Sequence, residues 1–288
     1  MFRKMMVCTD LTPASFSLIA CAAQLQQIGT KDIVLLHVVE SVAASAGTLL
    51  SSEAEGAFRR QKELLEEHGI NVAAEVLHGV PASVLDAAAE KHDVRGIVIG
   101  SHSKAVIALA TLGSVSAALL ARTLRPLLLY RVDAAERVGG GGGDEGCGSL
   151  FRHILFPTDF SDASERGLDY LGKIALEQHG AAITLLHVLP SDEDAEDGRT
   201  EEDAQYLLEA KKRRLERLGA SEVGIELVRG EAADEVINRG KAGLYSLVVM
   251  GCQGKGALKR VMVGSTAEQV TRRIEVPVLL VPGEHHVE

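Results

Sequence analysis

Short apolar runs alternate with longer segments of helical periodicity throughout the second half of the chain. The apolar runs are rich in Ile, Leu and Val, and they lie at Ile154–Pro157, Ile183–Val188, Val223–Val228, Leu244–Gly251 and Val278–Val281. The helical segments between them lie at Ser161–Gln178, Glu201–Leu218, Glu231–Arg239 and Thr266–Ile274. Continuous apolar runs are typical of strands buried on both faces of a parallel sheet. The alternation therefore predicts an α/β domain in which helices cover both faces of a five-stranded parallel sheet.

The same features recur in the first half, so the chain is a tandem duplication. Residues 8–12 correspond to residues 157–161 at a separation of 149 residues. Gly100 corresponds to Gly251 at a separation of 151 residues. A repeat of this length is a whole domain, because solenoid units are only about 20 to 50 residues long.

Two domains joined by a glycine-rich linker fit the length and the composition of the chain. Its 288 residues exceed the roughly 100 to 200 of a typical domain, and 46% of them are hydrophobic, which is ample for two cores. Five consecutive glycines, at 139–143, are typical of a flexible coil. We therefore predict a first domain at 1–132, a linker at 133–150 and a second domain at 151–288.

Charge and cysteine content exclude several classes of function. A net charge of −10 argues against nonspecific nucleic-acid binding, which depends on a basic surface. The uncharged stretch from Ala105 to Ala121 is shorter than the roughly 20 apolar residues of a membrane span, so no membrane partner is expected. No signal-type segment begins the chain, and the four cysteines lack metal-binding spacing. These features predict a cytoplasmic protein with reduced thiols.

The loops of most unusual composition follow the first and fourth predicted strands of the second domain. They are residues 157–159 and residues 251–265. If the strand order is 3-2-1-4-5, the two loops meet where the winding direction of the sheet reverses, which is where such domains bind ligands. Val188 ends the second strand and would form the neighbouring wall of one shared site.

The loop at 251–265 has the composition of an anion-binding site. Glycine lets the backbone adopt a positive φ and approach a ligand closely. The loop then opens a helix, whose free N–H groups and positive dipole end favour phosphate. Lys255, Lys259 and Arg260 add positive charge. The loop matches neither the P-loop nor the dinucleotide GxGxxG motif.

Glycines at 251, 254 and 264, followed by Ser265, resemble the signature of the ATP-binding branch of the universal stress protein family. That signature is G-x2-G-x9-G followed by Ser or Thr, and the resemblance extends over both halves of the chain. It implies two tandem Rossmann-like domains of the adenine nucleotide alpha hydrolase-like class. It also implies a stress-response or regulatory protein that binds ATP, ADP or AMP. A divalent Mg²⁺ or Mn²⁺ at the phosphates is compatible with it, and no metal ligands from the protein alone are expected.

The resemblance also assigns a nucleotide site in the second domain. Asp159 and Val188 would border the adenine, Gly251 would border the ribose, and the helix start near Ser265 would hold the phosphates. The full set of expected nucleotide-binding residues is Pro157, Thr158, Asp159, Val188, Met250, Gly251, Gly254, Gly264, Ser265 and Thr266.

The first half departs from the signature at three points. Cys8 stands in the place of Pro157, Ser103 in the place of a glycine, and uncharged residues at 108–109 in the place of a basic pair. A Cβ restricts φ and lost charge weakens anion binding, so we expect the nucleotide mainly in the C-terminal domain. A weaker or different ligand stays open for the first half. The residues of this degenerate site are Asp10, Val38, Gly100, Ser103, Gly113 and Ser114.

Other interpretations of these residues stay open at the level of sequence. Asp10 and Asp159 are also suited to capping the helices that follow them. His37 and His187 are more typical of structural histidines at strand ends than of catalytic bases. The sequence shows no recognisable catalytic constellation, so slow ATP hydrolysis is the most that it supports as an activity. A nucleotide-free scaffold or dimerisation protein is the main alternative.

The last strand of each half is expected to lie at a sheet edge, and open edges tend to be paired. In the family that the chain resembles, the last strands of two domains often pair across a dimer. Leu127–Tyr130 and Val278–Val281 would then pair within one chain and form a pseudo-dimer of the two domains. A homodimer and an unknown protein partner also stay open.

Overall fold

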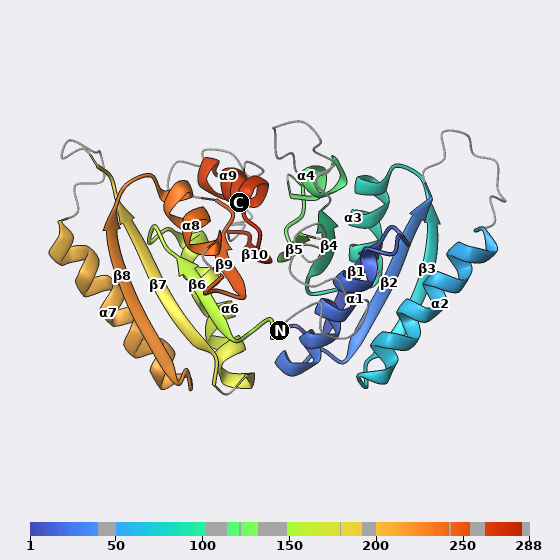
Figure 1. Cartoon of the computed structure of the whole chain (residues 1–288), viewed down its shortest axis with the longest axis horizontal. Helices are drawn as coiled ribbons and strands as arrows, with labels where there is room; N and C mark the ends of the chain where they lie inside the picture. The colour runs from blue at the N-terminus through green and yellow to red at the C-terminus, as the bar shows by residue number, and fades with distance from the viewer. Residues whose placement is uncertain are drawn as a thin grey trace. The chain divides into compact units, whose positions relative to one another are not determined.

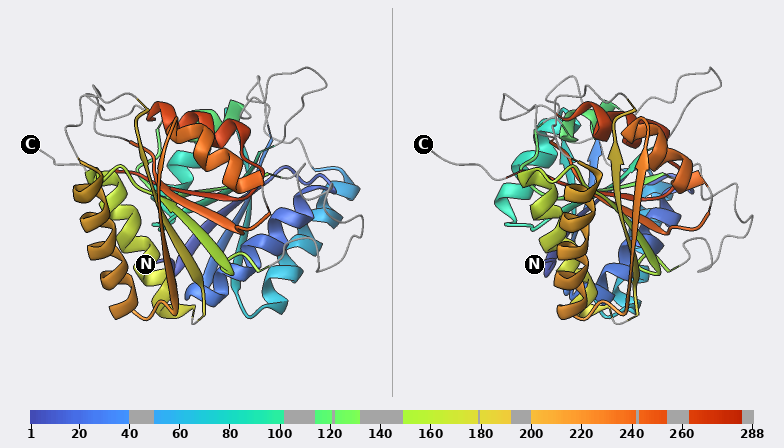
Figure 2. Two further views of the ribbon diagram at one scale, coloured as in Figure 1. Left: turned by 60° about the vertical axis from the view of Figure 1, so that its left-hand side comes forward. Right: turned by 90° about the vertical axis from the view of Figure 1, so that its left-hand side faces the viewer.

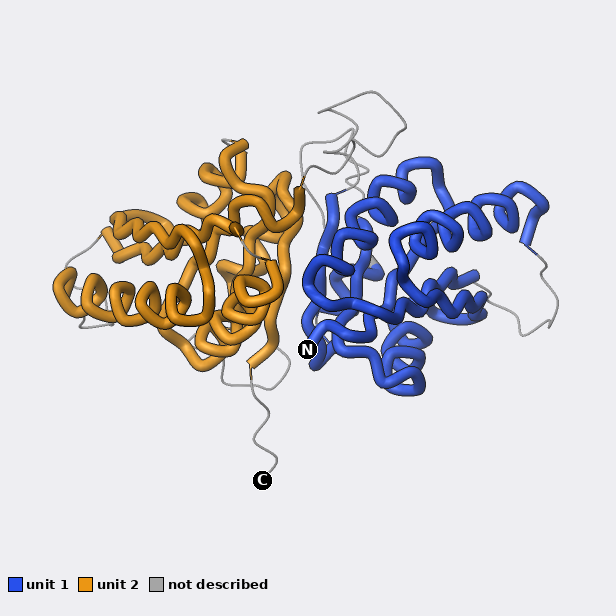
Figure 3. The backbone as a smooth tube through the Cα atoms, turned by 90° about the horizontal axis from the view of Figure 1, so that it is seen from below, with its two compact units in different colours: residues 1–148 blue, residues 149–288 orange. Residues whose placement is uncertain are grey.

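The computed structural model describes residues 1–39, 50–101, 114–120, 122–131, 149–178, 180–191, 200–241, 243–253 and 263–283. The chain divides into two compact units, residues 1–148 and residues 149–288 (Figure 3). Nearly all of the predicted linker lies outside the described residues, and so does most of the uncharged stretch at 105–121. The predicted linker boundaries therefore stay a prediction.

The first unit alternates strands with helices along the chain (Figure 1). Its strands are β1 (Lys4–Thr9), β2 (Asp32–Val39), β3 (Asn71–His78), β4 (Ile97–Ser101) and β5 (Leu127–Arg131). Its helices are α1 (Ser15–Ala23), the 3-10 helix η1 (Gln24–Ile28), α2 (Ser52–Glu67), α3 (Pro81–Lys91) and α4 (Ser114–Leu120).

The second unit repeats this alternation. Its strands are β6 (His153–Pro157), β7 (Ala182–Leu189), β8 (Glu222–Arg229), β9 (Leu247–Gly251) and β10 (Val278–Val281). Its helices are α6 (Asp162–Glu177), α7 (Glu201–Arg217), α8 (Ala232–Lys241) and α9 (Ser265–Arg273). Each predicted strand and helix of this half is found, with ends that differ by at most three residues.

Both units have the predicted strand order, and their strands are parallel. The order is β3-β2-β1-β4-β5 in the first unit and β8-β7-β6-β9-β10 in the second. In the second unit Ile154 of β6 lies between Ile183 of β7 and Leu247 of β9. The winding direction therefore reverses between β6 and β9, and the predicted α/β fold of two tandem five-stranded domains is confirmed.

Helices cover both faces of the second sheet, and the central strands are buried between them (Figure 2). Helices α6 and α7 pack together on one face, and α8 and α9 pack together on the other. Leu155 and Phe156 of β6 are fully buried, as predicted for a strand covered on both faces. The outer strand β8 does not fit that prediction, because most of its residues are partly or fully exposed. Its place at the end of the strand order leaves it less covered.

Local signals fix where several helices begin and end. The Ser161 side chain accepts a hydrogen bond from the backbone N–H of Ser164 and caps α6, as predicted. Gly219 follows α7 with a φ of 103°, a conformation that favours glycine. Strand β9 begins at Leu247, where its pairing with β6 starts, rather than at Leu244, which is 63% exposed. Within the described part of the chain, no helix is long and apolar enough to cross a membrane.

One glycine inside α2 and one that follows it offer a matched test of local backbone energetics. Gly56 lies within the helix and Gly69 follows it with a φ of 76°, and a Cβ at either position would meet nothing within 4 Å. We expect Gly56→Ala to raise the free energy of unfolding by about 0.5–1 kcal/mol, because alanine favours the helix. Gly69→Ala should lower it by about 1 kcal/mol, because an L-residue is strained at this φ. Urea unfolding followed by circular dichroism measures the free energy of unfolding of both variants. Equal changes in the two variants would contradict the assigned backbone conformations.

Candidate functional site

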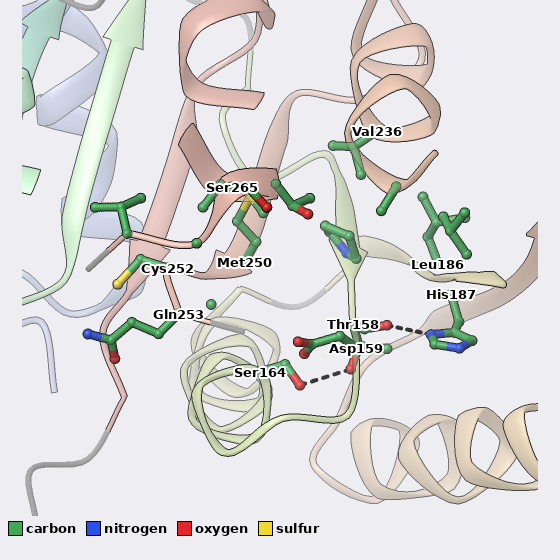
Figure 4. Close-up of a pocket in the computed structure, with 18 residues that line it drawn as sticks. Thr158, Asp159, Ser164, Leu186, His187, Val236, Met250, Cys252, Gln253 and Ser265 are labelled. Carbon is green, nitrogen blue, oxygen red and sulfur yellow. Dashed lines mark hydrogen bonds between the residues drawn. The ribbon is translucent and has the colours of Figure 1, made fainter. Parts of the chain in front are cut away.

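A cavity of about 370 Å³ lies at the predicted point in the second unit, between the carboxyl ends of β6 and β9 (Figure 4). The turn after β6, the end of β7, the first turns of α8 and α9, and the end of β9 form its walls. The residues that line it are Pro157, Thr158, Asp159, Ser164, Leu186, His187, Val188, Ala232, Val236, Met250, Gly251, Cys252, Gln253, Val263, Gly264, Ser265, Thr266 and Ala267.

The fold brings the expected nucleotide-site residues together around this one cavity. All of them except Gly254 line it, and Gly254 lies outside the described residues, as do the basic residues at 255, 259 and 260. The part of the cavity wall that α8 provides, Ala232 and Val236, was not predicted from the sequence. Only their position indicates a role in the site. Helix α8 follows the carboxyl end of the third strand of the unit, so it begins at the edge of the sheet where ligands bind.

The turn between β6 and α6 is held by its own side chains. The Thr158 hydroxyl accepts a hydrogen bond from the Phe160 N–H at 3.1 Å and pairs with the Ser164 hydroxyl at 3.0 Å. One carboxylate oxygen of Asp159 accepts hydrogen bonds from the N–H and the hydroxyl of Ser161, at 3.0 and 2.6 Å. Phe160 has a φ of 60°, which is uncommon for a residue with a side chain. The N-cap of α6 is Ser161 and not Asp159, so Asp159 does not cap the helix itself but holds the capping residue in place.

His187 fastens this turn to the neighbouring strand. Its Nδ1 lies 2.7 Å from the carbonyl oxygen of Thr158 (Figure 4). A carbonyl oxygen only accepts hydrogen bonds, so Nδ1 carries the hydrogen and donates. The imidazole also packs against the Phe160 ring, with the ring centroids 4.5 Å apart. This buried, bonded arrangement favours the structural interpretation of His187 over the catalytic one.

The first unit builds the same turn. The Asp10 carboxylate accepts hydrogen bonds from the N–H and the hydroxyl of Thr12, at 3.0 and 2.8 Å. His37 Nδ1 donates to the carbonyl oxygen of Thr9 at 2.9 Å, and Leu11 has a φ of 62°. The turn is therefore a property of the repeated domain and does not distinguish the two halves.

Gly251 is required by packing and not by a left-handed backbone. A Cβ at this position would lie 2.9 Å from both the Ala163 carbonyl carbon and the Ser164 nitrogen. Its φ is not positive, and Gly264 has a φ of −63°. Of the two properties of glycine that the sequence analysis considered, a positive φ is therefore not used at these two positions. The absent side chain instead lets the end of β9 contact the first turn of α6, which brings the two loops of the site together.

The start of α9 presents a hydrogen-bonding surface to the cavity. Gly264 is the N-cap and has no side chain with which to bond the first turn. Ser265, Thr266 and Ala267 of that turn line the cavity. Backbone N–H groups in a first helical turn lack partners within the helix, and the helix dipole places positive charge there. This wall is suited to an anion.

The loop that leaves β9 is anchored to the chain beyond β10. The Cys252 N–H donates to the Val281 carbonyl at 3.0 Å, and the Gly283 N–H donates to Gln253 Oε1 at 3.0 Å. Arg166 Nη1 donates to the Gly283 carbonyl at 2.5 Å. The wall formed by residues 252–253 is thus supported from α6 and from the segment that follows β10.

Asp159 is the one carboxylate among the described residues of the wall. The described residues contain no group of three His, Cys, Asp or Glu side chains that could hold a metal ion. Burial raises the pKa of the Cys252 thiol to about 11. The positive charge of nearby Arg166 offsets only part of this rise. The thiol is therefore protonated at neutral pH, which argues against a redox role.

The residues of the degenerate site lie at corresponding places in the first unit. Asp10 follows β1, Val38 is near the end of β2, Gly100 is near the end of β4, and Ser114 begins α4. Ser103 and Gly113 lie outside the described residues. The Ser116 hydroxyl donates to the Gly100 carbonyl at 3.3 Å, and the corresponding residue of the second unit is Ala267, which has no hydroxyl. The first turn of α4 is therefore bonded back to its own strand.

Two doubly wound domains in tandem, with a ligand-sized cavity where the winding of the second one reverses, define a Rossmann-like repeat protein. The model of the universal stress protein family matches residues 1–131 and 150–282. The chain therefore belongs to the universal stress protein family, as its glycine signature predicted.

Individual relatives agree with this assignment. A universal stress protein of Methanocaldococcus jannaschii is 31% identical over 142 residues, which cover 46% of this chain and 83% of that protein. The crystal structure of a universal stress protein from Archaeoglobus fulgidus has a TM-score of 0.71 at 22% identity, with 98% of each chain covered. A universal stress protein crystallised in complex with cAMP covers 47% of this chain and 100% of its own at 23% identity, with a TM-score of 0.39.

Gly251→Ala tests the contact between β9 and α6. We expect it to lower the free energy of unfolding of the second unit by about 1–3 kcal/mol, because the new Cβ meets backbone atoms, which cannot rotate away as the end of a flexible side chain can. Gly224→Ala in β8 is the matched control, since its Cβ would lie 3.7 Å from the nearest atom. Urea unfolding compares the two variants. A loss of similar size in both would show that the contact at Gly251 is not the cause.

Thiol labelling tests the burial of the cysteines. With a pKa of about 11, Cys252 is a thiolate in only about one molecule in 1,000 at pH 8. Cys8, whose pKa burial raises to about 12, is still less reactive. In a Cys147→Ser variant, we expect iodoacetamide at pH 8 to label the folded protein at least tenfold more slowly than the urea-unfolded protein. Mass mapping identifies the labelled residue, and rapid labelling of Cys252 in the folded protein would contradict the prediction.

Proposed function

We propose that the second unit binds an adenine nucleotide in the cavity at the ends of β6 and β9, and that occupancy regulates a protein partner in a stress response. The observation that carries the proposal is the arrangement of the walls. Leu186, Val188, Ala232 and Val236 form an apolar end, whereas Ser265 and Thr266 belong to the N-terminus of a helix. A base prefers the first surface and a phosphate chain prefers the second.

The size of the cavity supports a ligand of this class. Small-molecule sites usually have volumes of about 300 to 1,000 Å³, and the cavity is about 370 Å³. The basic residues Lys255, Lys259 and Arg260 follow β9 in the sequence and would add charge for the phosphates. A divalent ion would be held through the phosphates, since the described part of the wall offers it only Asp159.

A nucleotide-free scaffold is the second candidate, and one observation favours it. Asp159 and His187 make the same hydrogen bonds as Asp10 and His37 of the other unit, so those bonds need no ligand to explain them. Direct measurement of nucleotide binding and of ATP hydrolysis distinguishes the nucleotide-binding role from this scaffold role. The proposed role is binding, with slow hydrolysis as its upper limit.

Native mass spectrometry and titration calorimetry test the proposal. We expect one adenine nucleotide per chain, lost in Gly254→Val, because the family signature assigns Gly254 to the phosphates and a branched side chain there would hinder their approach. Thr266→Val should weaken ATP binding about tenfold, because it removes one hydroxyl that can bond a charged phosphate. Thr271→Val is the matched control on the same helix, since Thr271 bonds the backbone and does not line the cavity. A wild-type protein that carries no nucleotide and gives no heat with ATP would refute the proposal.

A further inference from the structure

The chain beyond β10 is bonded to the site from two directions. From the loop after β9, the Cys252 N–H donates to the Val281 carbonyl, and Gln253 Oε1 accepts from the Gly283 N–H, each at 3.0 Å. From α6, Arg166 Nη1 donates to the Gly283 carbonyl at 2.5 Å. These bonds join α6 to the loop after β9 through the segment 281–283. We call this segment, together with Arg166 and Gln253, the brace.

Side chains bond both backbone groups of Gly283. Strand β10 ends at Val281, so Gly283 lies two residues beyond the strand. Gly283 is nevertheless buried, and a buried N–H or C=O group needs a partner. Gln253 and Arg166 supply one partner each. Two long side chains thus continue the contact past the end of the strand, and one of them, Gln253, also lines the cavity.

The loop that the brace supports also holds the start of α9. The Cys252 carbonyl accepts a hydrogen bond from the N–H of Gly264 at 2.8 Å, and Gly264 is the N-cap of that helix. Cys252 is therefore bonded to the brace through its N–H and to α9 through its carbonyl. Figure 4 shows Cys252, Gln253 and Ser265 on the side of the cavity opposite His187. The brace therefore supports the helix start that is suited to an anion, away from the apolar end.

We propose that Arg166 and Gln253 are positioning residues of the site, because the brace that they hold keeps the loop after β9 and the start of α9 in place. This inference rests on the proposed nucleotide function and deepens it. An intact brace favours ligands that carry phosphate and has little effect on the base. Linkage requires a reverse effect of the same size, so a bound phosphate chain stabilises the brace. The chain beyond β10 is then a part of the unit whose stability changes with occupancy of the cavity.

Two variants break the brace in different ways. Arg166→Met removes the donor to the Gly283 carbonyl. In Gly283→Ala, which changes no charge, the new Cβ would lie 2.6 Å from Gln253 Oε1. That oxygen ends a flexible side chain, so it moves away and its bond to residue 283 is lost while the fold is kept. Lys173→Met is the matched control for Arg166→Met, because Lys173 is an exposed cation on the same helix and does not line the cavity.

Calorimetry with ATP and with adenosine measures the effect on binding in the full chain. We expect each brace variant to weaken ATP binding about tenfold, which is the size of effect that one lost hydrogen bond produces. Adenosine has no phosphate, so its affinity should be nearly unchanged. Lys173→Met should bind both ligands as the wild type does. By linkage, ATP should slow hydrogen exchange at the Gly283 N–H of the wild-type protein by a factor similar to that lost in the variants.

Thiol labelling of Cys252 tests the brace without any nucleotide. In the Cys147→Ser background, iodoacetamide should label Cys252 about fivefold faster in both brace variants than in Lys173→Met, because the loop opens locally more often. Labelling of Cys8, which belongs to the other unit, should not change. Thermal unfolding checks that each variant is folded.

The outcomes separate the inference from the function on which it rests. No binding of ATP or of adenosine by the wild-type protein would refute the proposed function. Weaker ATP binding in neither brace variant, or in Arg166→Met alone, would overturn the inference while leaving nucleotide binding intact, since the second result assigns the effect to charge. An equal loss of ATP and adenosine binding, unchanged labelling of Cys252, or no protection of Gly283 by ATP would overturn it as well.

Discussion

The contact between the end of β9 and the first turn of α6 is the constraint on which the rest of the site depends. It exists because Gly251 has no Cβ, so that its backbone lies directly against Ala163 and Ser164. This contact brings the loop after β9 beside the turn after β6. The cavity, the anchored segment at 252–253 and the approach of α9 all follow from that proximity. A glycine in a nucleotide signature can thus be required by the protein's own packing before any ligand is present.

The duplication supplies an internal comparison that a single domain would not offer. Both units contain the same turn, in which a carboxylate bonds the residue two positions further on and a histidine bonds the carbonyl of the preceding threonine. What separates them is the environment around it. The Ser116 hydroxyl bonds the Gly100 carbonyl, whereas the corresponding residue of the second unit, Ala267, has no hydroxyl and lines the cavity. Features that both units share therefore reflect the common fold, and features that differ reflect the divergence of the two sites.

The sequence predicted the fold well because the hydrophobic pattern is strong and the repeat provides it twice. The strand order and the meeting of the loops at 157–159 and 251–265 followed from the topology of doubly wound sheets. The walls at Ala232 and Val236 were missed, since small apolar residues in a helix carry no chemical signal. The contact of Gly251 with α6 was not predicted either, because a close approach between backbones involves residues far apart in the sequence. Such contacts are decided by three-dimensional packing and leave no local pattern.

The hydrogen-bonded turn shared by both units affects how related sequences should be interpreted. In the second unit His187 bonds the Thr158 carbonyl, and the side chains of Thr158 and Asp159 bond Ser164 and Ser161. In the first unit His37 bonds the Thr9 carbonyl, and the side chains of Thr9 and Asp10 bond Ser15 and Thr12. A homologue that retains these three residues has kept the means to fold its first loop correctly. Their retention alone is therefore a marker of domain integrity, and assigning a ligand to such a homologue requires comparing the side chains that leave space beside the turn.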